Sequence, residues 1–368
     1  MNLPTTSQIK IAIVGDALVL SGGTEKVTLF LSNMFPDAPI FTSVYLPENT
    51  FPEFGTKKII TMPFAGRVKN ERNFKRLFPW WYLNFILLDL RGFDIIISSS
   101  SYLAKYINPP RGVAHICCLQ NPFRLLWRPS EYDQQSVPYG RISMAIIKLL
   151  LPLARKVDIA KTRRIRHVIA NSQNMANQMR NIYGIEPEVA YPPIAIEQFL
   201  IARTSGDYYL YAGRLISHKR ADLAIQACNR LNRKLIVAGD GLERRVLEEL
   251  RGDTVEFVGR VSNEKLKQLY SNCRALLFPS DEDFGMVPVE VQASGRPVIA
   301  YRSGGVLETV IENQTGVFFD SQDVEALCAA ILRFEKMEFA PGSIRENAMR
   351  FDQAIFASKV RTCISKYI

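Results

Sequence analysis

The chain has 368 residues, of which 47% are hydrophobic and 22% charged, and its formal net charge is +10 at pH 7. This balance is typical of a globular protein with buried cores, it excludes a disordered or fibrous chain, and the length favours two domains. The charge is uneven, because residues 1–200 hold 23 Lys and Arg against 14 Asp and Glu, whereas residues 201–368 hold 23 against 22.

The N-terminal half begins with an apolar run, residues 9–15, that predicts a strand, followed by Gly22-Gly23 and a helical pattern. This order is the repeating unit of a doubly wound parallel sheet. Further strands are expected at residues 40–44, 58–61, 95–98, 113–118 and 167–171. The two glycines can let backbone amides approach a phosphate, but a tight turn requires glycine equally, and the G-x-G-x-x-G fingerprint is absent.

Two basic stretches, residues 57–76 and 155–166, hold the excess charge, and the aromatic run Trp80-Trp81-Tyr82 follows the first. Basic residues beside Trp and Tyr suit an anionic membrane surface. They would also suit a plain solvated surface or nucleic acid, although no nucleic-acid-binding signature supports the last. Residues 142–154 are apolar but too short to span a membrane, and we expect a buried helix there in preference to an interfacial segment.

The N-terminal segment, residues 1–10, is short and polar and leads straight into the first expected strand. We therefore expect no secretory signal. Six cysteines are scattered without metal-ligand spacing, and we expect them to be buried and reduced, as in a cytoplasmic protein. They are Cys117, Cys118, Cys228, Cys273, Cys328 and Cys363.

The C-terminal half follows a linker predicted by Pro192-Pro193. Strands are expected at residues 209–212, 234–238, 255–258 and 275–278, with helices at 221–231, 242–250 and 263–271. This alternation predicts a second parallel sheet with crossover helices. The fold class is therefore α/β, with two Rossmann-like domains.

The most informative motif is a pair of glutamates, Glu282 and Glu290, that follows the strand at 275–278. Glu282 is expected in the loop at the strand's carboxyl end, where open α/β sheets bind ligands. Glu290 is expected about two turns further on, in the helix that follows. Carboxylates there can accept hydrogen bonds from a sugar and a ribose, although a solvated helix face is the alternative explanation for such spacing. Asp281-Glu282-Asp283 imitates a metal-binding D-x-D motif, but we interpret it as part of the longer glutamate motif.

Arg214 and Lys219 lie five residues apart in one loop that follows a strand. Arginine can bind diphosphate oxygens through two N–H groups, and lysine adds a point charge. Such a pair would stabilise a leaving diphosphate without a metal ion, whereas two ordinary surface cations are the alternative.

Together these residues resemble the retaining family-four glycosyltransferases, which have the GT-B fold, and the resemblance covers nearly the whole chain. The motifs that carry it are Gly22-Gly23-Thr24-Glu25, Ala170-Asn171-Ser172, Tyr211-Ala212-Gly213-Arg214 with Lys219, Gly239-Asp240-Gly241, Phe257-Val258-Gly259, and Glu282 with Glu290. Residues 121–127 resemble the mannosyltransferase branch that builds bacterial surface polysaccharides.

The resemblance implies an N-terminal acceptor domain at residues 1–190, a nucleotide-sugar domain at 191–350, and a final helix at 351–368 that returns to the first domain. Glu282, Arg214 and Lys219 would be catalytic. The donor would be bound by the residues of several loops: Gly23, Gln120, Arg260, Val261, Phe284, Gly285, Met286, Val287 and Glu290. Within this set Glu290 would bind the ribose, and the Arg260-Val261 loop would meet the base. Gln120 stands where related enzymes have histidine, so it can hydrogen-bond a hydroxyl but cannot act as a cation or general base.

The expected activity is transfer of a hexose, with mannose favoured, from a nucleotide-sugar to a saccharide acceptor in polysaccharide biosynthesis. GDP-mannose is the favoured donor and a UDP-hexose the second, with no metal or other cofactor. The acceptor is expected to be lipid-linked, at an anionic membrane surface on the inner face of the plasma membrane, with no nucleic-acid partner. A non-catalytic nucleotide-sugar-binding protein and a nicotinamide-dependent oxidoreductase are the alternatives.

Overall fold

The computed structural model describes residues 9–129, 141–202 and 204–368. Its contacts divide the chain into two compact units. Unit 1 comprises residues 1–192 and 357–368, and unit 2 comprises residues 193–356. The first division lies two residues beyond the expected boundary at 190. The second falls within the last helix, α14 (Gln353–Ser365), and not at residue 350.

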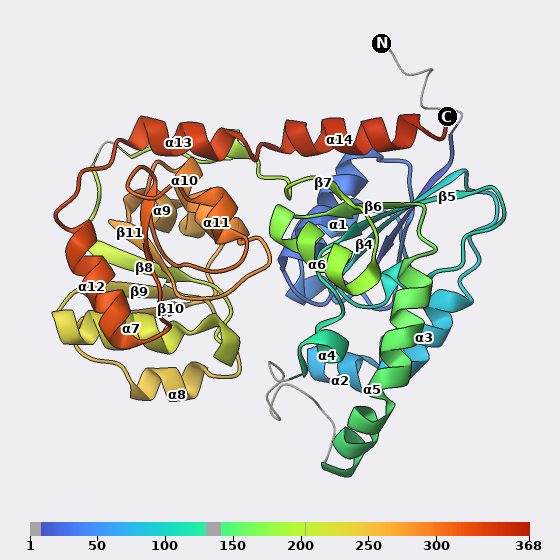
Figure 1. Cartoon of the computed structure of the whole chain (residues 1–368), viewed down its shortest axis with the longest axis horizontal. Coiled ribbons are helices and arrows are strands. Elements are labelled where there is room, and N and C mark those ends of the chain that lie inside the picture. The colour runs from blue at the N-terminus through green and yellow to red at the C-terminus, as the bar shows by residue number, and fades with distance from the viewer. Residues whose placement is uncertain (1–8, 130–140, 203) are drawn as a thin grey trace. The chain divides into compact units, whose positions relative to one another are not determined.

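Unit 1 contains a seven-stranded parallel sheet in the order β3-β2-β1-β4-β5-β6-β7 (Figure 1). The strands are β1 (Ile11–Gly15), β2 (Ile40–Thr42), β3 (Ile59–Thr61), β4 (Ile95–Ser100), β5 (Ala114–Leu119), β6 (His167–Ala170) and β7 (Glu188–Val189). The central strands β4 and β5 are buried at every position, as expected for a parallel sheet covered on both faces. The short β7 was not predicted, because its two residues adjoin the proline linker.

The helices of unit 1 are α1 (Gly23–Met34), α2 (Glu71–Arg76), α3 (Phe78–Ile86), α4 (Arg124–Trp127), α5 (Arg141–Thr162) and α6 (Gln173–Tyr183), together with most of α14. Local chemistry sets the bounds of α6. The Ser172 hydroxyl accepts a hydrogen bond from the Met175 amide at its start, and Gly184 adopts a left-handed conformation at its end.

Unit 2 contains a six-stranded parallel sheet in the order β10-β9-β8-β11-β12-β13. Its strands are β8 (Tyr208–Ala212), β9 (Lys234–Ala238), β10 (Val255–Gly259), β11 (Ala275–Phe278), β12 (Val298–Tyr301) and β13 (Gly316–Phe319). In Figure 1, α7 (Ala221–Leu231), α8 (Arg244–Glu249) and α12 (Val324–Phe334) lie on one side of these strands. On the other side lie α9 (Asn263–Asn272), α10 (Met286–Ala293), α11 (Val306–Thr309) and α13 (Pro341–Met349).

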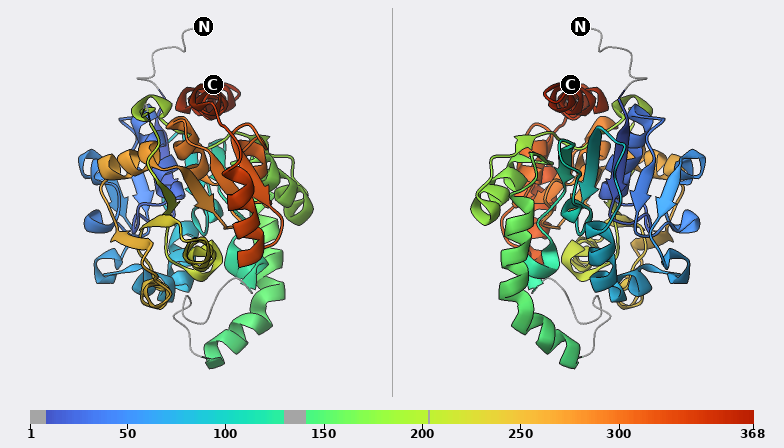
Figure 2. Two further views of the ribbon diagram at one scale, coloured as in Figure 1. Left: turned by 90° about the vertical axis from the view of Figure 1, so that its left-hand side faces the viewer. Right: turned by 90° about the vertical axis from the view of Figure 1, so that its right-hand side faces the viewer.

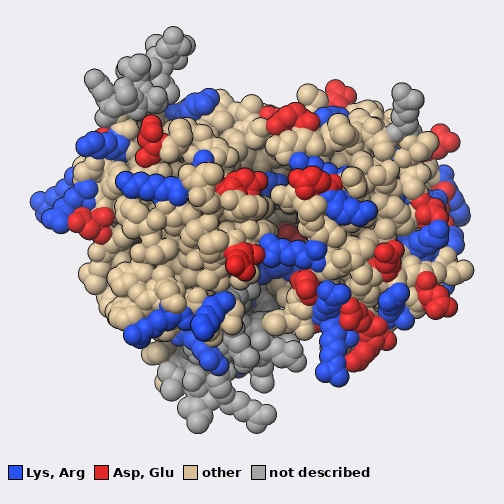
Figure 3. Space-filling view, turned by 180° about the vertical axis from the view of Figure 1, so that it is seen from behind, with Lys and Arg blue, Asp and Glu red and all other residues tan. Residues whose placement is uncertain are grey.

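The nearly neutral charge of the second half is reflected on its surface. On the face drawn in Figure 3, acidic and basic side chains lie interspersed over unit 2, on the right. Exposed ion pairs in this unit join Arg230 to Glu325 at 2.5 Å and Arg244 to Glu248 at 2.8 Å. Such pairs contribute little stability individually, so the packed cores on the sheet faces hold the unit together.

A buried ionic cluster organises one side of unit 1. The Asp158 carboxylate, on α5, pairs with Lys105 Nζ at 2.5 Å, and both side chains are fully buried. It also accepts hydrogen bonds from Tyr106, Trp127 and Tyr183, at 2.7, 2.6 and 2.9 Å. Trp127 therefore anchors a loop.

Helix α5 differs from the buried helix expected at residues 142–154. Leu149, Leu153 and Val157 lie on one helical face and are 79%, 61% and 37% exposed. In both views of Figure 2, the first turns of this green helix extend away from the strands of unit 1. Among the described residues, no helix is long and apolar enough to cross a membrane.

Candidate active site

Each sheet has a point where the chain reverses the direction in which it adds strands. In unit 2 this point lies between β8 and β11, since β9 and β10 extend the sheet one way and β12 and β13 the other. Open α/β sheets bind ligands beyond the carboxyl ends of the two strands at such a point. The loop after β8 carries Arg214 and Lys219, and the loop after β11 carries Glu282.

The structure brings two of the three predicted catalytic residues into direct contact. Lys219 Nζ forms an ion pair with Glu282 Oε1, and their side chains are 15% and 24% exposed. The buried Ser280 hydroxyl donates a hydrogen bond of 3.2 Å to the same oxygen. The carboxylate is therefore held in place but remains partly accessible to a ligand.

Arg214 lies in the same loop as Lys219, and its side chain is exposed. Among the described residues, it makes no ion pair. Beneath the loop, the buried Tyr211 hydroxyl contacts the carbonyl oxygens of Arg214 and Lys219, at 3.3 and 3.4 Å. Burial and the neighbouring Glu282 carboxylate raise the pKa of Tyr211, so its hydroxyl stays protonated and braces both ends of the loop.

Glycines allow the loops around this point to pack backbone against backbone. A Cβ built on Gly304, whose φ is +68°, would lie 2.2 Å from the Glu282 carbonyl oxygen. One built on Gly239, with φ of +139°, would lie 1.9 Å from the carbonyl oxygen of Gly213. Because only glycine fits either position, these turns fix the paths of the Glu282 loop and the Arg214 loop.

Helix α10 starts directly after the Glu282 loop. Gly285 adopts a left-handed conformation with φ of +84° and introduces Met286 and Val287 as the first helical residues. The first N–H groups of a helix lack intrahelical partners and favour an anion. The predicted backbone contacts at Gly285, Met286 and Val287 therefore lie at a helix N-terminus. The Phe284 side chain is buried and packs on Phe351, with ring centroids 5.7 Å apart.

Glu290 lies one turn further along α10, and its side chain is 9% exposed. The Tyr270 hydroxyl, on α9, donates a hydrogen bond of 3.0 Å to Glu290 Oε2. Burial and the carboxylate raise the pKa of Tyr270 well above its usual value, which keeps it a donor. This contact explains the orientation of Glu290, and it excludes the solvated helix face that was the alternative explanation for its spacing.

Arg260 and Val261 follow β10, which is the edge strand of the sheet, two strands from β8. Strands are spaced about 4.8 Å apart, so this loop lies roughly 10 Å from the end of β8 along the same edge. Arg260 is exposed and Val261 half-buried. The position is consistent with contact to a more distant part of a ligand than the Lys219–Glu282 pair reaches.

In unit 1 the corresponding reversal point lies between β1 and β4. Gly23 is the first residue of α1, and the next residue, Thr24, forms a hydroxyl–hydroxyl hydrogen bond of 2.7 Å with Ser101, which follows β4. Gln120, which follows β5, is buried, and its carbonyl oxygen accepts a hydrogen bond of 2.8 Å from Asn171. Gly23 and Gln120 therefore lie at the same carboxyl edge.

Sequence reasoning missed Asp16, which organises this edge. Its buried carboxylate follows β1 and accepts hydrogen bonds from four successive amides, those of Ser101, Tyr102, Leu103 and Ala104. An Asp at the carboxyl end of the first strand was the available signal. It holds the loop after β4 in the shape that presents Ser101 to Thr24.

Two family models match the chain. "Glycosyltransferase Family 4" matches residues 21–198, and "Glycosyl transferases group 1" matches residues 195–352. The two sheets and these two matches together define the class of protein: the chain belongs to the glycosyltransferases and has the GT-B fold.

Several individual proteins are similar to it. The O-antigen chain mannosyltransferase RfbU of Salmonella typhimurium is 28% identical over 312 residues, which are 80% of this chain and 81% of that protein. The sulfoquinovosyl transferase SQD2 of Arabidopsis thaliana is 28% identical over 212 residues, 53% of this chain and 41% of that protein. A GDP-mannose-dependent alpha-mannosyltransferase of Corynebacterium glutamicum is 33% identical over 122 residues, covering 33% of this chain and 29% of that protein. The chain thus matches about half or less of the length of several curated relatives.

Solved structures with the same fold cover nearly the whole chain. HepE of Anabaena in complex with UDP has a TM-score of 0.69 and 18% identity, covering 97% of this chain and all of that one. Sucrose-phosphate synthase of Thermosynechococcus elongatus has a TM-score of 0.74 and 18% identity, covering 97% and 98%. At this identity the likeness extends to the fold alone.

Proposed function

We propose that this glycosyltransferase moves a hexose, mannose in preference, from a nucleoside diphosphate sugar to a saccharide acceptor, with retention of configuration. The observation that carries the proposal is the Lys219–Glu282 ion pair at the reversal point of the second sheet, with the exposed Arg214 in the same loop. Cations and a carboxylate are what a diphosphate and a sugar hydroxyl require.

Each group has a distinct role. Arg214 and Lys219 bind the diphosphate and stabilise the charge that develops on it as the sugar leaves. Glu282 accepts hydrogen bonds from the sugar hydroxyls, and the N-terminal amides of α10, at Met286 and Val287, bind phosphate. Glu290, oriented by the Tyr270 hydroxyl, binds the ribose. The donor contacts predicted for Gly23, Gln120 and Arg260-Val261 remain predictions.

The proposed reaction needs no protein nucleophile. The acceptor oxygen attacks the anomeric carbon from the face that the diphosphate leaves, as the bond to the phosphate oxygen breaks. That departing oxygen takes the acceptor's proton, so the products are the glycoside and the nucleoside diphosphate. The protein supplies positioning and electrostatic stabilisation, and the two cations take the part that a metal ion has in other transferases.

GDP-mannose is the favoured donor, with a UDP-hexose second. Support for the first comes from the similarity to the RfbU mannosyltransferase and to the GDP-mannose-dependent enzyme. Support for the second comes from HepE, whose structures contain UDP or UDP-glucose. We propose a lipid-linked acceptor. The exposed apolar face of α5 beside Lys148 and Lys156 supports contact with an anionic membrane surface.

A donor panel tests this proposal. Thermal unfolding is measured with GDP-mannose, UDP-glucose, UDP-galactose, UDP-N-acetylglucosamine and NADH, with and without EDTA. Because a chelator can alter stability by itself, each shift is the difference between donor and no donor at one EDTA concentration. Stabilisation by a nucleotide-sugar that EDTA leaves unchanged is expected. No shift with any nucleotide-sugar, or a shift with NADH alone, would overturn the proposal. Binding without release of the diphosphate would indicate a non-catalytic binding protein.

A further inference from the structure

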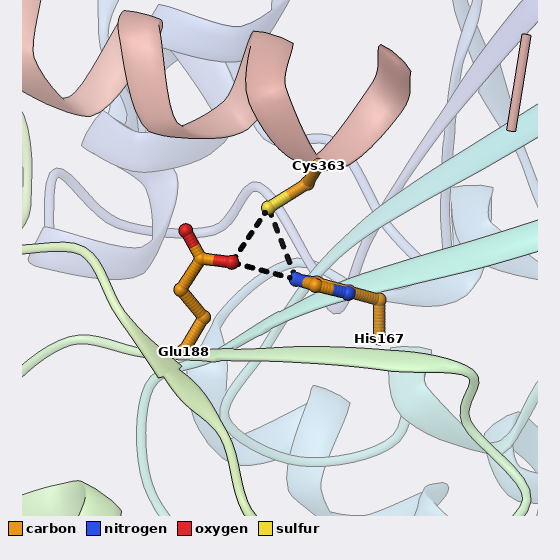
Figure 4. A group of neighbouring side chains, drawn as sticks. All are labelled: His167, Glu188 and Cys363. Carbon is orange, nitrogen blue, oxygen red and sulfur yellow. Dashed lines mark hydrogen bonds and ion pairs between the residues drawn. The ribbon is translucent and has the colours of Figure 1, made fainter. Parts of the chain in front are cut away.

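Three side chains capable of binding a metal converge in unit 1 from distant parts of the chain (Figure 4). His167 is the first residue of β6, Glu188 the first of β7, and Cys363 lies in α14. Their side chains point toward one another in Figure 4, and one ligand atom from each lies within 4.8 Å of the others. Spacing along the chain does not predict the group, because 196 residues separate His167 from Cys363.

The separations within the group are close to those between ligands of a tetrahedral zinc ion. His167 Nε2 lies 3.2 Å from Glu188 Oε2 and 3.0 Å from Cys363 Sγ, and Sγ lies 3.5 Å from Oε2. Zinc bonds of about 2.0–2.3 Å place tetrahedral ligand atoms about 3.3–3.6 Å apart. A zinc ion would therefore require the sulfur and nitrogen to separate by only about half an ångström.

The arrangement does not suit a cysteine nucleophile. In a nucleophile–base–carboxylate chain, the thiol and the carboxylate contact different nitrogens of the imidazole. Here the Cys363 sulfur and the Glu188 oxygen both approach Nε2 of His167. The thiol is also fully buried, and burial with the Glu188 carboxylate beside it raises its pKa to about 12. The nitrogen, oxygen and sulfur atoms of the three side chains face one another, which is the arrangement that a bound metal ion requires.

We propose that His167, Glu188 and Cys363 form a zinc site that ties α14 to β6 and β7. The mixed nitrogen, sulfur and oxygen ligand set favours zinc over magnesium or calcium, which prefer oxygen alone. The ion binds the thiolate, whose proton passes to solvent, while the imidazole binds through Nε2 and carries its proton on Nδ1. The fourth position belongs to water or the second oxygen of Glu188.

The surroundings indicate a structural role for the ion. Lys359 Nζ donates a hydrogen bond to the Val189 carbonyl oxygen, and Lys366 Nζ pairs with Glu188 at 3.4 Å, so α14 is already joined to β7. His167 opens β6, whereas the predicted donor contact Gln120 and its partner Asn171 lie at the other end of these strands. Four residues of strand span about 13 Å, so the ion is not part of the glycosyl-transfer site.

The test uses the full chain without an affinity tag, after removal of metal by a chelator and dialysis. Zinc is titrated against a chromophoric chelator, and the cobalt complex is examined by absorption. We expect one zinc ion per chain, a higher melting temperature, and a thiolate-to-cobalt charge-transfer band. Cys363→Ser and His167→Gln should each weaken zinc binding tenfold to a hundredfold or more, on the order of what even outer contacts to a metal contribute.

The matched control is Cys228→Ser, which removes a buried cysteine of unit 2 and should leave zinc binding unchanged. Absence of the cobalt–thiolate band from the wild-type protein would overturn the proposal. Equal zinc affinity in wild type and Cys363→Ser would overturn it as well. The cobalt spectrum of the wild-type protein decides the matter even if a variant fails to fold, and neither measurement depends on glycosyl transfer.

Discussion

Lys219 and Glu282 form an ion pair between the loops that follow β8 and β11, although 63 positions separate them in the chain (219 to 282). Both loops leave the sheet where its strand order reverses, and the side chains of Lys219 and Glu282 are both half-buried. The pair places a cation and a carboxylate in direct contact. In the proposed reaction the diphosphate draws Lys219 away and leaves Glu282 to the sugar.

Removing the carboxylate charge should impair transfer while donor binding persists. Glu282→Gln keeps the side-chain size but loses charge and half of the acceptor capacity, so we expect a fall in kcat of about a hundredfold, the size typical of a lost transition-state contact. Steady-state kinetics with the donor identified by the panel measure this fall. Glu346→Gln, the same change at an exposed glutamate of α13 in the same unit, serves as the control and should keep wild-type activity. Full activity in Glu282→Gln would contradict the role given to this residue.

Gly304→Ala should displace the backbone of the Glu282 loop. The new Cβ would meet the Glu282 carbonyl oxygen at 2.2 Å, and φ of +68° is unfavourable for alanine. We expect a loss of about 1–3 kcal/mol in the free energy of unfolding, together with lower activity. Urea unfolding measures the loss. Gly342→Ala is the control, because a Cβ there meets no atom within 4 Å, and it should lower neither stability nor activity.

The Lys105–Asp158 pair predicts a pH dependence of stability. Burial opposes ionisation of Asp158, but Lys105 and the surrounding hydrogen bonds outweigh it and lower the pKa of the carboxyl below its ordinary value of 3.8. A carboxyl whose pKa is lower in the folded state stabilises the protein fully above the unfolded pKa. That stability is lost as the pH falls through the folded pKa.

Asp158→Ala leaves the Lys105 charge buried without its partner and should cost about 3–5 kcal/mol in the free energy of unfolding at neutral pH. Because the variant has no carboxyl to protonate, its stability should fall less steeply than that of wild type below pH 3.8. Urea unfolding at pH 7 and at several values below pH 4 measures both effects. An equal loss of stability on acidification in both proteins would contradict this account of the cluster.

The exposed face of α5 predicts membrane binding that depends on apolar contact. Leu149→Glu with Leu153→Glu replaces two exposed leucines by charges, and sedimentation with vesicles of anionic phospholipid at low salt should fall by about tenfold or more. Leu242→Glu, at a leucine of unit 2 that is 64% exposed, is the control and should sediment like wild type. If the wild-type protein does not sediment with these vesicles, the proposed contact with an anionic membrane surface is wrong.

Sequence patterns predicted the two parallel sheets and the loops that carry the candidate site. Strands such as β9 and β11 agree with the predicted ranges to the residue, because apolar runs ended by Gly239 and by Pro279 specify both type and length. For these strands, the sequence pattern that predicts the strand lies within the strand and the residues next to it.

Features that depend on tertiary contacts were not predictable in the same way. The apolar residues of α5 suggested burial, but periodicity does not reveal whether a face has a partner. Trp127 turned inward because Asp158, 31 residues later, accepts its N–H. The His167–Glu188–Cys363 group requires α14 to return to unit 1, which no local spacing encodes.

The most direct test of the central claim is the rate at which Arg214→Ala releases nucleoside diphosphate from its donor. Arg214 is exposed and pairs with no described residue, so the substitution should leave the melting temperature unchanged while slowing release by about a hundredfold or more. Arg245→Ala, which removes an arginine that is 93% exposed in the same unit, should match wild type. Turnover near the wild-type rate in Arg214→Ala would contradict the assignment of this loop to the leaving diphosphate.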